Sequence, residues 1–304
     1  MANAFLKPEV IANAALGILR REVVLPATVS RLGINDFRGA KDDTITMRVP
    51  AIRTAKTRAM RSGSALVAED LTEVGVDVTL DTHVYDLANI TDEELTLDIK
   101  DFGGQVLQPQ IRGVVEELED TIATALAGAT VGAGQTLTVD ESDEPYDVFV
   151  DARKVLNGLN VPRNARWAVL GANVEAWALK SDKLSKVNES GTDSALRDAT
   201  LGRIAGFTTL GSNAIDPDAA YFYVSSAIAF ALVAPVVPAG ATFGQSVTGE
   251  GLSLRWLRDY DPTYARDRSL VDAFTGASSV EDTYNEDPAF NRRLVKLELA
   301  GAGS

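Results

Sequence analysis

The spacing of apolar residues changes from helical to alternating early in the chain. Pro8 suits the first position of a helix, and the apolar spacing after it predicts a short amphipathic helix over residues 8–19. Alternation of apolar and polar residues over 44–49 and over 74–80 predicts two β-strands.

The segment between these two strands, residues 51–73, has no clear period. Long connections between strands are uncommon in compact domains and usually have a function. This one carries four basic side chains and has no acidic residue from position 51 to 68. The sequence therefore predicts an extended two-stranded arm whose tip is basic, with Arg53, Lys56, Arg58 and Arg61.

A longer helical pattern begins near Val106 and ends at Gly128, with apolar residues every three or four positions. We expect Pro109 to bend or restart this helix near its beginning, because proline lacks the amide hydrogen that a helix interior uses. The polar face of this helix carries several acidic residues and a single basic residue, Arg112. These acids are Glu116, Glu117, Glu119 and Asp120.

The second half of the chain mixes short helical and strand patterns after a Gly/Thr-rich and then acidic boundary at residues 129–145. The charge-free run 219–249 is expected to form buried strands, because serines and prolines interrupt it and a membrane-spanning helix needs about 20 apolar residues. We predict helices at 146–156 and 174–179, a polar loop at 180–198, and strands at 167–170, 207–210, 221–224, 252–257 and 294–299.

Composition excludes several kinds of chemistry. The 304 residues contain no cysteine and one histidine, His83, which excludes disulfides, thiolate zinc sites and multi-histidine metal sites. His83 lies in an alternating strand pattern and is expected to be structural. The N-terminus lacks the basic start of a signal peptide, so we expect a soluble protein made inside the cell.

Charge is strongly segregated along the chain. The first 61 residues carry eleven Lys or Arg against five Asp or Glu, and the next 99 carry four against twenty-one. One molecule therefore has two complementary surfaces and is suited to recognise copies of itself. The net charge of −14 argues against an enzyme that binds nucleic acid, but it permits a container that holds nucleic acid without adhering to it.

Three further sequence patterns are better explained by a structural role than by catalysis or ligand binding. The acidic clusters 92–94 and 140–144 could in principle hold Ca²⁺ or supply an acid/base pair, but they lack the ligand alternation and glycine of a calcium loop. We expect solvated surface there. Gly202 and Gly206 flank Arg203, but no Gly-Lys-Ser/Thr follows, so a turn is expected instead of a phosphate loop. The sequence predicts no cofactor and no metal site.

Several local stretches, in this order, resemble the major capsid proteins of tailed bacteriophages, which have the Hong Kong 97-type shell fold. They are Leu-Gly-Arg-Ile-Ala-Gly-Phe at 201–207, Gly-Ser-Asn at 211–213, Tyr-Phe-Tyr at 221–223, Ala-Ile-Ala-Phe-Ala at 227–231 and Gly-Leu-Ser-Leu-Arg at 251–255. The opening at residues 2–12 and the entry into the long helix at 101–109 are similar to the coat proteins of the Salmonella-phage type. The resemblance covers nearly the whole chain.

The resemblance implies an α+β fold with five parts. These are an N-terminal arm (1–43), an extended β-hairpin or E-loop (44–90), a peripheral domain with a long spine helix (91–144), an axial domain (145–239), and return strands to the peripheral domain with the C-terminus (240–304). The chain has no room for the inserted immunoglobulin-like domain of some relatives. The N-terminal helix is expected to dock on its own subunit or on a neighbour or scaffold, since helices this short are marginal alone.

The function implied is structural. Such a protein is not an enzyme; it self-assembles as hexamers and pentamers into an icosahedral shell around double-stranded DNA, which it encloses without sequence-specific binding. A separate scaffolding protein, a portal and a decoration protein are expected partners, with assembly in the host bacterial cytoplasm and a final place in the virion. The alternatives are an encapsulin-like compartment that houses enzyme cargo and, more distantly, a carboxylate-dependent hydrolase.

Together with this resemblance, the segregated charge leads to a hypothesis about the interface between subunits. In this fold the extended loop reaches over the peripheral domain of a neighbour. The basic loop (Arg53, Lys56, Arg58, Arg61) is therefore expected to meet the acidic helix face (Glu116, Glu117, Glu119, Asp120) of another subunit. The alternative is that both are solvated charged surfaces.

Overall fold

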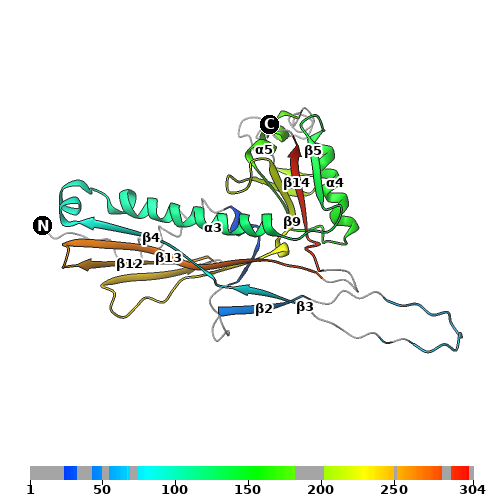
Figure 1. The fold of residues 1–304 in the computed structure, drawn as a ribbon, viewed down its shortest axis with the longest axis horizontal. Coiled ribbons are helices and arrows are strands. Elements are labelled where there is room, and N and C mark those ends of the chain that lie inside the picture. Colours follow the sequence, from blue (N-terminus) through cyan, green and yellow to red (C-terminus); the bar gives the residue numbers. More distant parts are fainter. Residues whose placement is uncertain are drawn as a thin grey trace.

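The structure is a computed structural model that describes residues 24–32, 43–49, 55–66, 68, 74–181, 202–249, 252–282 and 289–300. The predicted N-terminal helix, Arg53 and nearly all of the predicted loop 180–198 lie outside these ranges. The described chain forms two six-stranded sheets, a two-stranded hairpin and three α-helices (Figure 1). The predicted α+β class is confirmed.

The first sheet, here the peripheral sheet, has the strand order β1-β10-β13-β12-β11, and β4 pairs with the other side of β13. The long strand β13 is antiparallel to β4, β10 and β12, so it organises the whole sheet. The strands are β1 (Ser30–Leu32), β4 (Thr82–Thr91), β10 (Ile228–Val233), β11 (Phe243–Gly249), β12 (Leu252–Asp261) and β13 (Arg266–Ser279).

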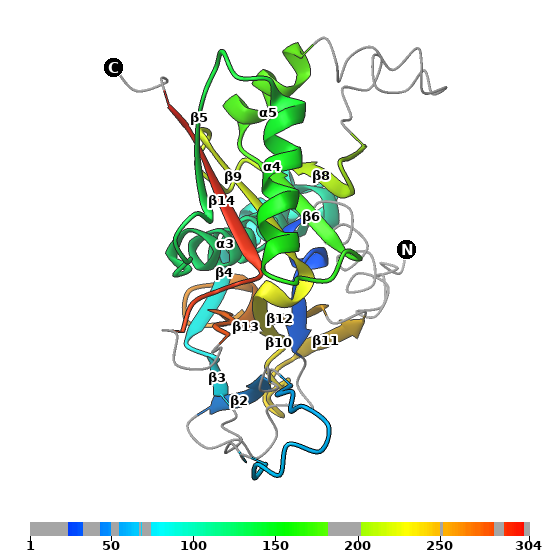
Figure 2. The same cartoon turned by 90° about the vertical axis from the view of Figure 1, so that its right-hand side faces the viewer.

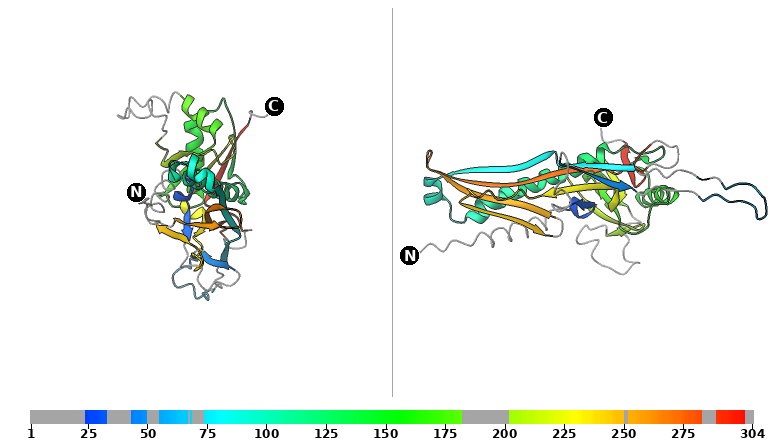
Figure 3. Two further views of the ribbon diagram at one scale, coloured as in Figure 1. Left: turned by 90° about the vertical axis from the view of Figure 1, so that its left-hand side faces the viewer. Right: turned by 90° about the horizontal axis from the view of Figure 1, so that it is seen from below.

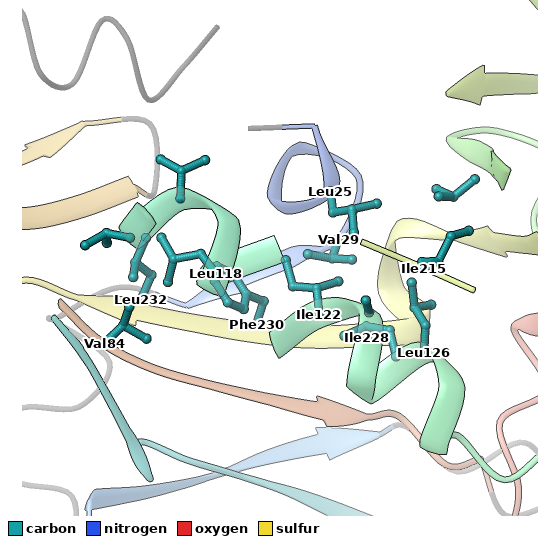
Figure 4. Close-up of a cluster of buried hydrophobic side chains, with 14 of the residues drawn as sticks. Leu25, Val29, Val84, Leu118, Ile122, Leu126, Ile215, Ile228, Phe230 and Leu232 are labelled. Atoms are coloured by element: carbon teal, nitrogen blue, oxygen red, sulfur yellow. The ribbon is translucent and has the colours of Figure 1, made fainter. Parts of the chain in front are cut away.

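Helix α3 (Gln108–Gly128) lies along one face of the peripheral sheet (Figure 1). Its Leu118, Ile122 and Leu126 face Phe230 and its neighbours on β10 in one buried cluster (Figure 4). Burying each such side chain contributes about 1.5–3 kcal/mol. Pro109 stands in the first turn of α3, directly after the π-helical turn η4 (Gly103–Leu107), so the prediction that proline restarts the helix is confirmed.

The second sheet, here the axial sheet, has the order β5-β14-β9-β6-β8-β7. Helices α4 (Pro145–Gly158) and α5 (Ala172–Lys180) pack on one face of it (Figure 2). Phe222 is central to that contact, with Phe149 and Phe207 edge-on to its ring at 5.0 and 5.2 Å. The strands are β5 (Thr136–Asp140), β6 (Arg166–Leu170), β7 (Arg203–Ile204), β8 (Phe207–Gly211), β9 (Ala219–Val224) and β14 (Leu294–Ala300).

Three expectations about which segments pack together were wrong. Residues 129–145, expected to be a boundary, contain β5 of the axial sheet. Strand β10, placed within the axial segment 145–239, belongs to the peripheral sheet, because the chain crosses between the sheets at the short 3₁₀ turn Ser225–Ala227. Strand β14, placed with the return strands of 240–304, pairs instead with β5 and β9 of the axial sheet.

The N-terminal segment that the structure describes ties the two sheets together. Thr28 Oγ1 donates to the Leu25 carbonyl (2.7 Å) and lies 2.6 Å from the hydroxyl of Tyr223 on β9. Tyr223 is fully buried, and this burial raises the pKa of its phenol. Strand β1 then pairs in parallel with β10 of the peripheral sheet.

Strands β2 (Thr44–Val49) and β3 (Val74–Thr79) form an antiparallel hairpin, as predicted. The loop between them projects far beyond the rest of the molecule (Figures 1 and 3). A small separate core fixes the base of the hairpin, where Val76 and Val78 pack against Ala229 and Ala231 of β10 and against Val280. Among the described residues, no helix is long and apolar enough to cross a membrane.

Candidate subunit interface

The projecting loop presents basic and apolar side chains together. Lys56, Arg58 and Arg61, which the sequence places in an acid-free basic segment, are all exposed. Between and beside them, Met60 is 91% and Leu66 80% exposed, which is unusual for large apolar side chains. These five residues are called the loop tip below.

The loop tip has a defined local structure. The Arg58 guanidinium donates to the Ser64 carbonyl, and the Ser62 hydroxyl lies 2.9 Å from that of Ser64. Arg61 has a φ of 63° in the turn at Met60 and Arg61, in the left-handed region that most side chains avoid. The prediction of a two-stranded arm holds only at its base, because residues 55–66 form no strand. Apolar alternation stops at Val49, so nothing beyond it favours cross-strand pairing.

The four acidic residues on the polar face of α3 differ in their surroundings. Glu119 turns toward the N-terminal segment, where its Oε1 accepts hydrogen bonds from the amides of Val24 (3.0 Å) and Leu25 (3.3 Å). Glu116 forms an exposed ion pair one turn away with Arg112, of the kind worth about 0–1 kcal/mol. Glu117 and Asp120 are exposed. Sequence reasoning placed all four acids outward, but Glu119 serves its own chain.

His83, expected from the sequence to be structural, makes a side-chain contact within the peripheral sheet. It lies on β4, and its Nε2 is 2.9 Å from Oδ2 of Asp272 on β13. An ionised carboxylate only accepts hydrogen bonds, so Nε2 carries the proton. The other Asp272 partner is Arg255 on β12, directly opposite in the strand register.

Residues 141–144 of the acidic cluster 140–144 line a cavity of about 550 Å³ beside α5, which Trp177, Lys180 and Ser181 also line. The hydroxyl of Ser181 donates to Glu144, and Asp140 accepts from the Ser142 amide. The hydrogen bonds from Ser142 lower the pKa of Asp140, whereas a general acid at neutral pH needs a raised one. Within the described residues, no three acidic or histidine side chains are grouped as metal ligands.

The turn predicted at Gly202 and Gly206 is confirmed. Both glycines have positive φ values, 61° and 92°; Gly202 directly precedes β7, and Gly206 lies in the tight turn between β7 and β8. The Thr209 hydroxyl donates to the Gly202 carbonyl (2.6 Å), which closes the turn without a ligand.

A second exposed surface was not recognised from the sequence as a contact site. It lies at the end of the peripheral sheet far from the loop, where the π-helical turn η3 (Glu94–Asp98) follows β4 (Figure 1). Leu97 is 77% exposed there, and Tyr264 in the turn between β12 and β13 is 68% exposed. The only signal in the sequence was the acidic run at 92–94, which was interpreted as solvated surface.

A spine helix along one sheet, a second sheet covered by helices and a long projecting hairpin together define the Hong Kong 97-type fold of phage capsid proteins. The chain matches a structure from Mycobacterium phage Che8 at 18% identity, with a TM-score of 0.64 over 91% of each chain. It matches the capsid structure of the cyanophage P-SCSP1u at 9% identity and TM-score 0.65, over 99% of this chain and 91% of that one.

A structure from an archaeal source also matches the fold. The chain matches a virus-like particle from Pyrococcus furiosus at 13% identity and TM-score 0.53, over 95% of this chain and 98% of that one. No protein-family model and no curated protein sequence matches this chain. At these identities the likeness concerns the fold.

Proposed function

We propose that this chain is a major capsid protein, which self-assembles into an icosahedral shell around the double-stranded DNA of a tailed bacteriophage. One observation carries the proposal: a capsid fold matched along nearly the whole chain, including a loop that projects with apolar side chains exposed. Exposed apolar surface of this kind marks a place where another protein binds.

The finer parts of the proposal follow from the same fold. Subunits form hexamers and pentamers, assemble in the host bacterial cytoplasm with a separate scaffolding protein and a portal, and remain in the virion, with room for a decoration protein. The chain works by binding and not by catalysis. The nearest relatives we propose are coat proteins of the Salmonella-phage type. The net charge of −14 suits a wall that encloses DNA without adhering to it.

Electron microscopy of the purified chain, alone and with a coexpressed scaffolding protein, tests this function. We expect closed shells that elute as particles far larger than any small oligomer. An encapsulin-like compartment, the alternative expected from the sequence, would form shells without a scaffold and copurify with cargo protein. Elution as a small oligomer under every condition would contradict both and would favour an enzyme.

We further propose that the basic loop (Arg53, Lys56, Arg58 and Arg61) docks on an acidic surface of a neighbouring subunit. The α3 face (Glu116, Glu117, Glu119 and Asp120) is the acceptor expected from the sequence, and the side chains of Glu117 and Asp120 on it are exposed. Each exposed ion pair contributes only about 0–1 kcal/mol, so charge would determine register and partner choice while apolar contact supplies adhesion.

The double substitution Arg58→Glu and Arg61→Glu is expected to prevent assembly at low salt while the subunit stays folded. Both side chains are exposed, so the substitutions should leave the melting temperature unchanged. Sedimentation would measure the fraction of chain in particles, and circular dichroism would check the fold. Normal shells from the folded variant at low salt would show that loop charge plays no part in assembly.

A further inference from the structure

Part of the axial sheet is strongly basic, although the chain as a whole has a net charge of −14. Residues 152–174 contain four basic residues and residues 202–215 contain one, and neither stretch contains an acidic residue. The two stretches include the second half of α4, the loop that follows it, β6, and the hairpin of β7 and β8. Their basic residues, here the axial basic surface, are Arg153, Lys154, Arg163, Arg166 and Arg203.

The tertiary structure brings these residues together at one edge of the axial sheet, where α4 packs (Figure 2). Arg153 extends from α4 to the turn between β7 and β8, and its Nη1 donates to the Ala205 carbonyl (2.7 Å). Arg203 lies in the same hairpin on β7, which is the edge strand. Burial lowers the pKa of Arg166, and the charges of Arg153 and Arg163 lower it further, so both lie close enough to repel it.

Arg166 holds the loop between α4 and β6, residues 159–165, in place. The residue is only 3% exposed. Its guanidinium donates to the carbonyls of Val161 (2.6 Å) and Pro162 (2.7 Å) and to Oδ1 of Asn157 (3.0 Å). These neutral oxygens satisfy its N–H groups but do not balance its charge. Because arginine is rarely so buried without a counter-charge, an anion from outside the chain would complete these surroundings.

The other members of the axial basic surface face outward without acidic partners. Lys154, Arg163 and Arg203 are exposed and Arg153 is half-buried. None of the five basic residues forms an ion pair with a described residue, whereas the arginines of β12 and β13 each pair with an aspartate. The acidic cluster 140–144 follows β5, at the opposite edge of the same sheet. The field at the axial basic surface is therefore positive.

The axial basic surface lacks the apolar side chains that a protein partner would bury. No large apolar side chain is exposed in residues 152–174 or 202–215, and the nearest one, Val150, lies on the preceding turn of α4. The loop tip, by contrast, combines its charges with exposed Met60 and Leu66. Protein interfaces are centred on apolar and aromatic anchors, whereas nucleic-acid backbones are bound mainly through charge. Four of the five basic residues are arginines, whose planar fork of donors fits phosphate.

We propose that the axial basic surface binds the phosphate backbone of double-stranded DNA without preference for its sequence. Lys154, Arg163 and Arg203 contact phosphate oxygens from the solvent side, and buried Arg166 adds a charge that salt screens less. The inference rests on the proposed function for the source of the phosphates, which is the enclosed DNA. The contact is confined to one edge of the axial sheet, while the net negative charge of the chain repels DNA elsewhere.

Binding of a short fluorescent DNA duplex to the full-length subunit tests this inference. The variant Lys154→Gln/Arg163→Gln/Arg203→Gln removes three exposed charges. Each lost phosphate contact lowers the steepness of log affinity against log salt by about one, so we expect a loss of about three and several-fold weaker binding. Duplexes of unrelated sequence should bind equally well. Arg166 stays unaltered because it also holds the loop.

The control variant is Lys56→Gln/Arg58→Gln/Arg61→Gln, which removes the same number of positive charges from the loop tip. It should keep the affinity and the salt dependence of the unaltered chain. Equal losses in the two triple variants would mean that DNA responds only to net charge, and this would overturn the inference. So would a failure of the unaltered subunit to bind DNA.

The alternative occupant of the axial basic surface is the acidic cluster 140–144 of a second copy. In that case the axial variant would lose shell formation but keep its affinity for DNA, which would also contradict the inference. We expect normal shells from this variant by electron microscopy. The DNA measurement uses the subunit and does not depend on assembly. Failure of the unaltered chain to form shells would therefore contradict the proposed function and leave the DNA result to decide the inference.

Discussion

Replacing Gly276 with alanine is expected to lower the free energy of unfolding by about 1–3 kcal/mol and to prevent shell formation. Gly276 lies on β13 where the end of β3 crosses it. A Cβ atom at this position would stand 1.9 Å from the carbonyl oxygen of Thr79 and 3.0 Å from its carbonyl carbon. Both are backbone atoms, so no side-chain rotation can relieve the overlap. Strand β3 itself must move.

The effect on assembly follows from the geometry of the hairpin. Strand β3 is the base of the projecting loop, and its Val76 and Val78 hold it against Ala229 and Ala231. A displacement at Thr79 therefore tilts the loop, and the error grows along its length to the loop tip. Hydrogen exchange should show lost protection in β2 and β3, while α4 and α5 keep theirs.

Gly240→Ala is the matched control for this prediction. A Cβ atom at Gly240 would meet nothing within 4 Å, so the same chemical change should leave both stability and assembly intact. Chemical denaturation would compare the two variants, and electron microscopy would count the shells. A Gly276→Ala protein as stable and as competent for assembly as Gly240→Ala would refute the prediction.

The strands predicted from the sequence are those whose buried positions are apolar. The all-apolar run of β9 and the alternation of β2 and β3 give a clear signal, and all three strands are present. Strand β13, the longest of all, was missed. Its buried positions include Asp267, Ser269 and Asp272, which read as surface in a sequence. The arginine partners of the two aspartates come from β12, and that pairing exists only once the sheet has formed.

Burial pattern also does not reveal which sheet a strand joins. Every residue of β9 and of β10 is buried, so the two strands look alike in the sequence. They nevertheless belong to different sheets, because the 3₁₀ turn at Ser225–Ala227 redirects the chain between them. Short β5, within a Gly/Thr-rich segment, becomes a strand because β14 offers it a parallel edge.

The basic part of the candidate site could be predicted from the composition of the loop. A run of basic residues without acids identified the loop tip, and its exposure is as expected. The position of Glu119 was not predictable, since it sits at the border between the apolar stripe and the polar face, and only the docked N-terminal segment decides its direction. Leu97 was missed because Leu95, Leu97 and Ile99 alternate like a strand, whereas Leu95 and Leu97 lie in a π-helical turn that exposes Leu97.

Asp272→Ala is expected to be the most destabilising single substitution of a polar residue, at about 3–5 kcal/mol. The carboxylate is fully buried and accepts hydrogen bonds from Arg255 Nε (2.9 Å), from a second Arg255 nitrogen and from His83 Nε2 (2.9 Å). Removing it leaves the Arg255 guanidinium nearly buried without its counter-charge. Since Arg255 lies on β12 and His83 on β4, the loss would loosen β13 from strands on both sides.

Two controls separate burial from charge. Asp272→Asn keeps the shape and one acceptor, so it should cost less than alanine while still leaving Arg255 without a charge partner. Asp259→Ala removes the partner of Arg268 from a half-exposed pair on the same two strands, which should cost about 0–1 kcal/mol. Urea denaturation of the three variants would measure the differences. Equal losses for Asp272→Ala and Asp259→Ala would mean that solvent reaches Asp272 and that β13 is held by its backbone ladder and apolar contacts alone.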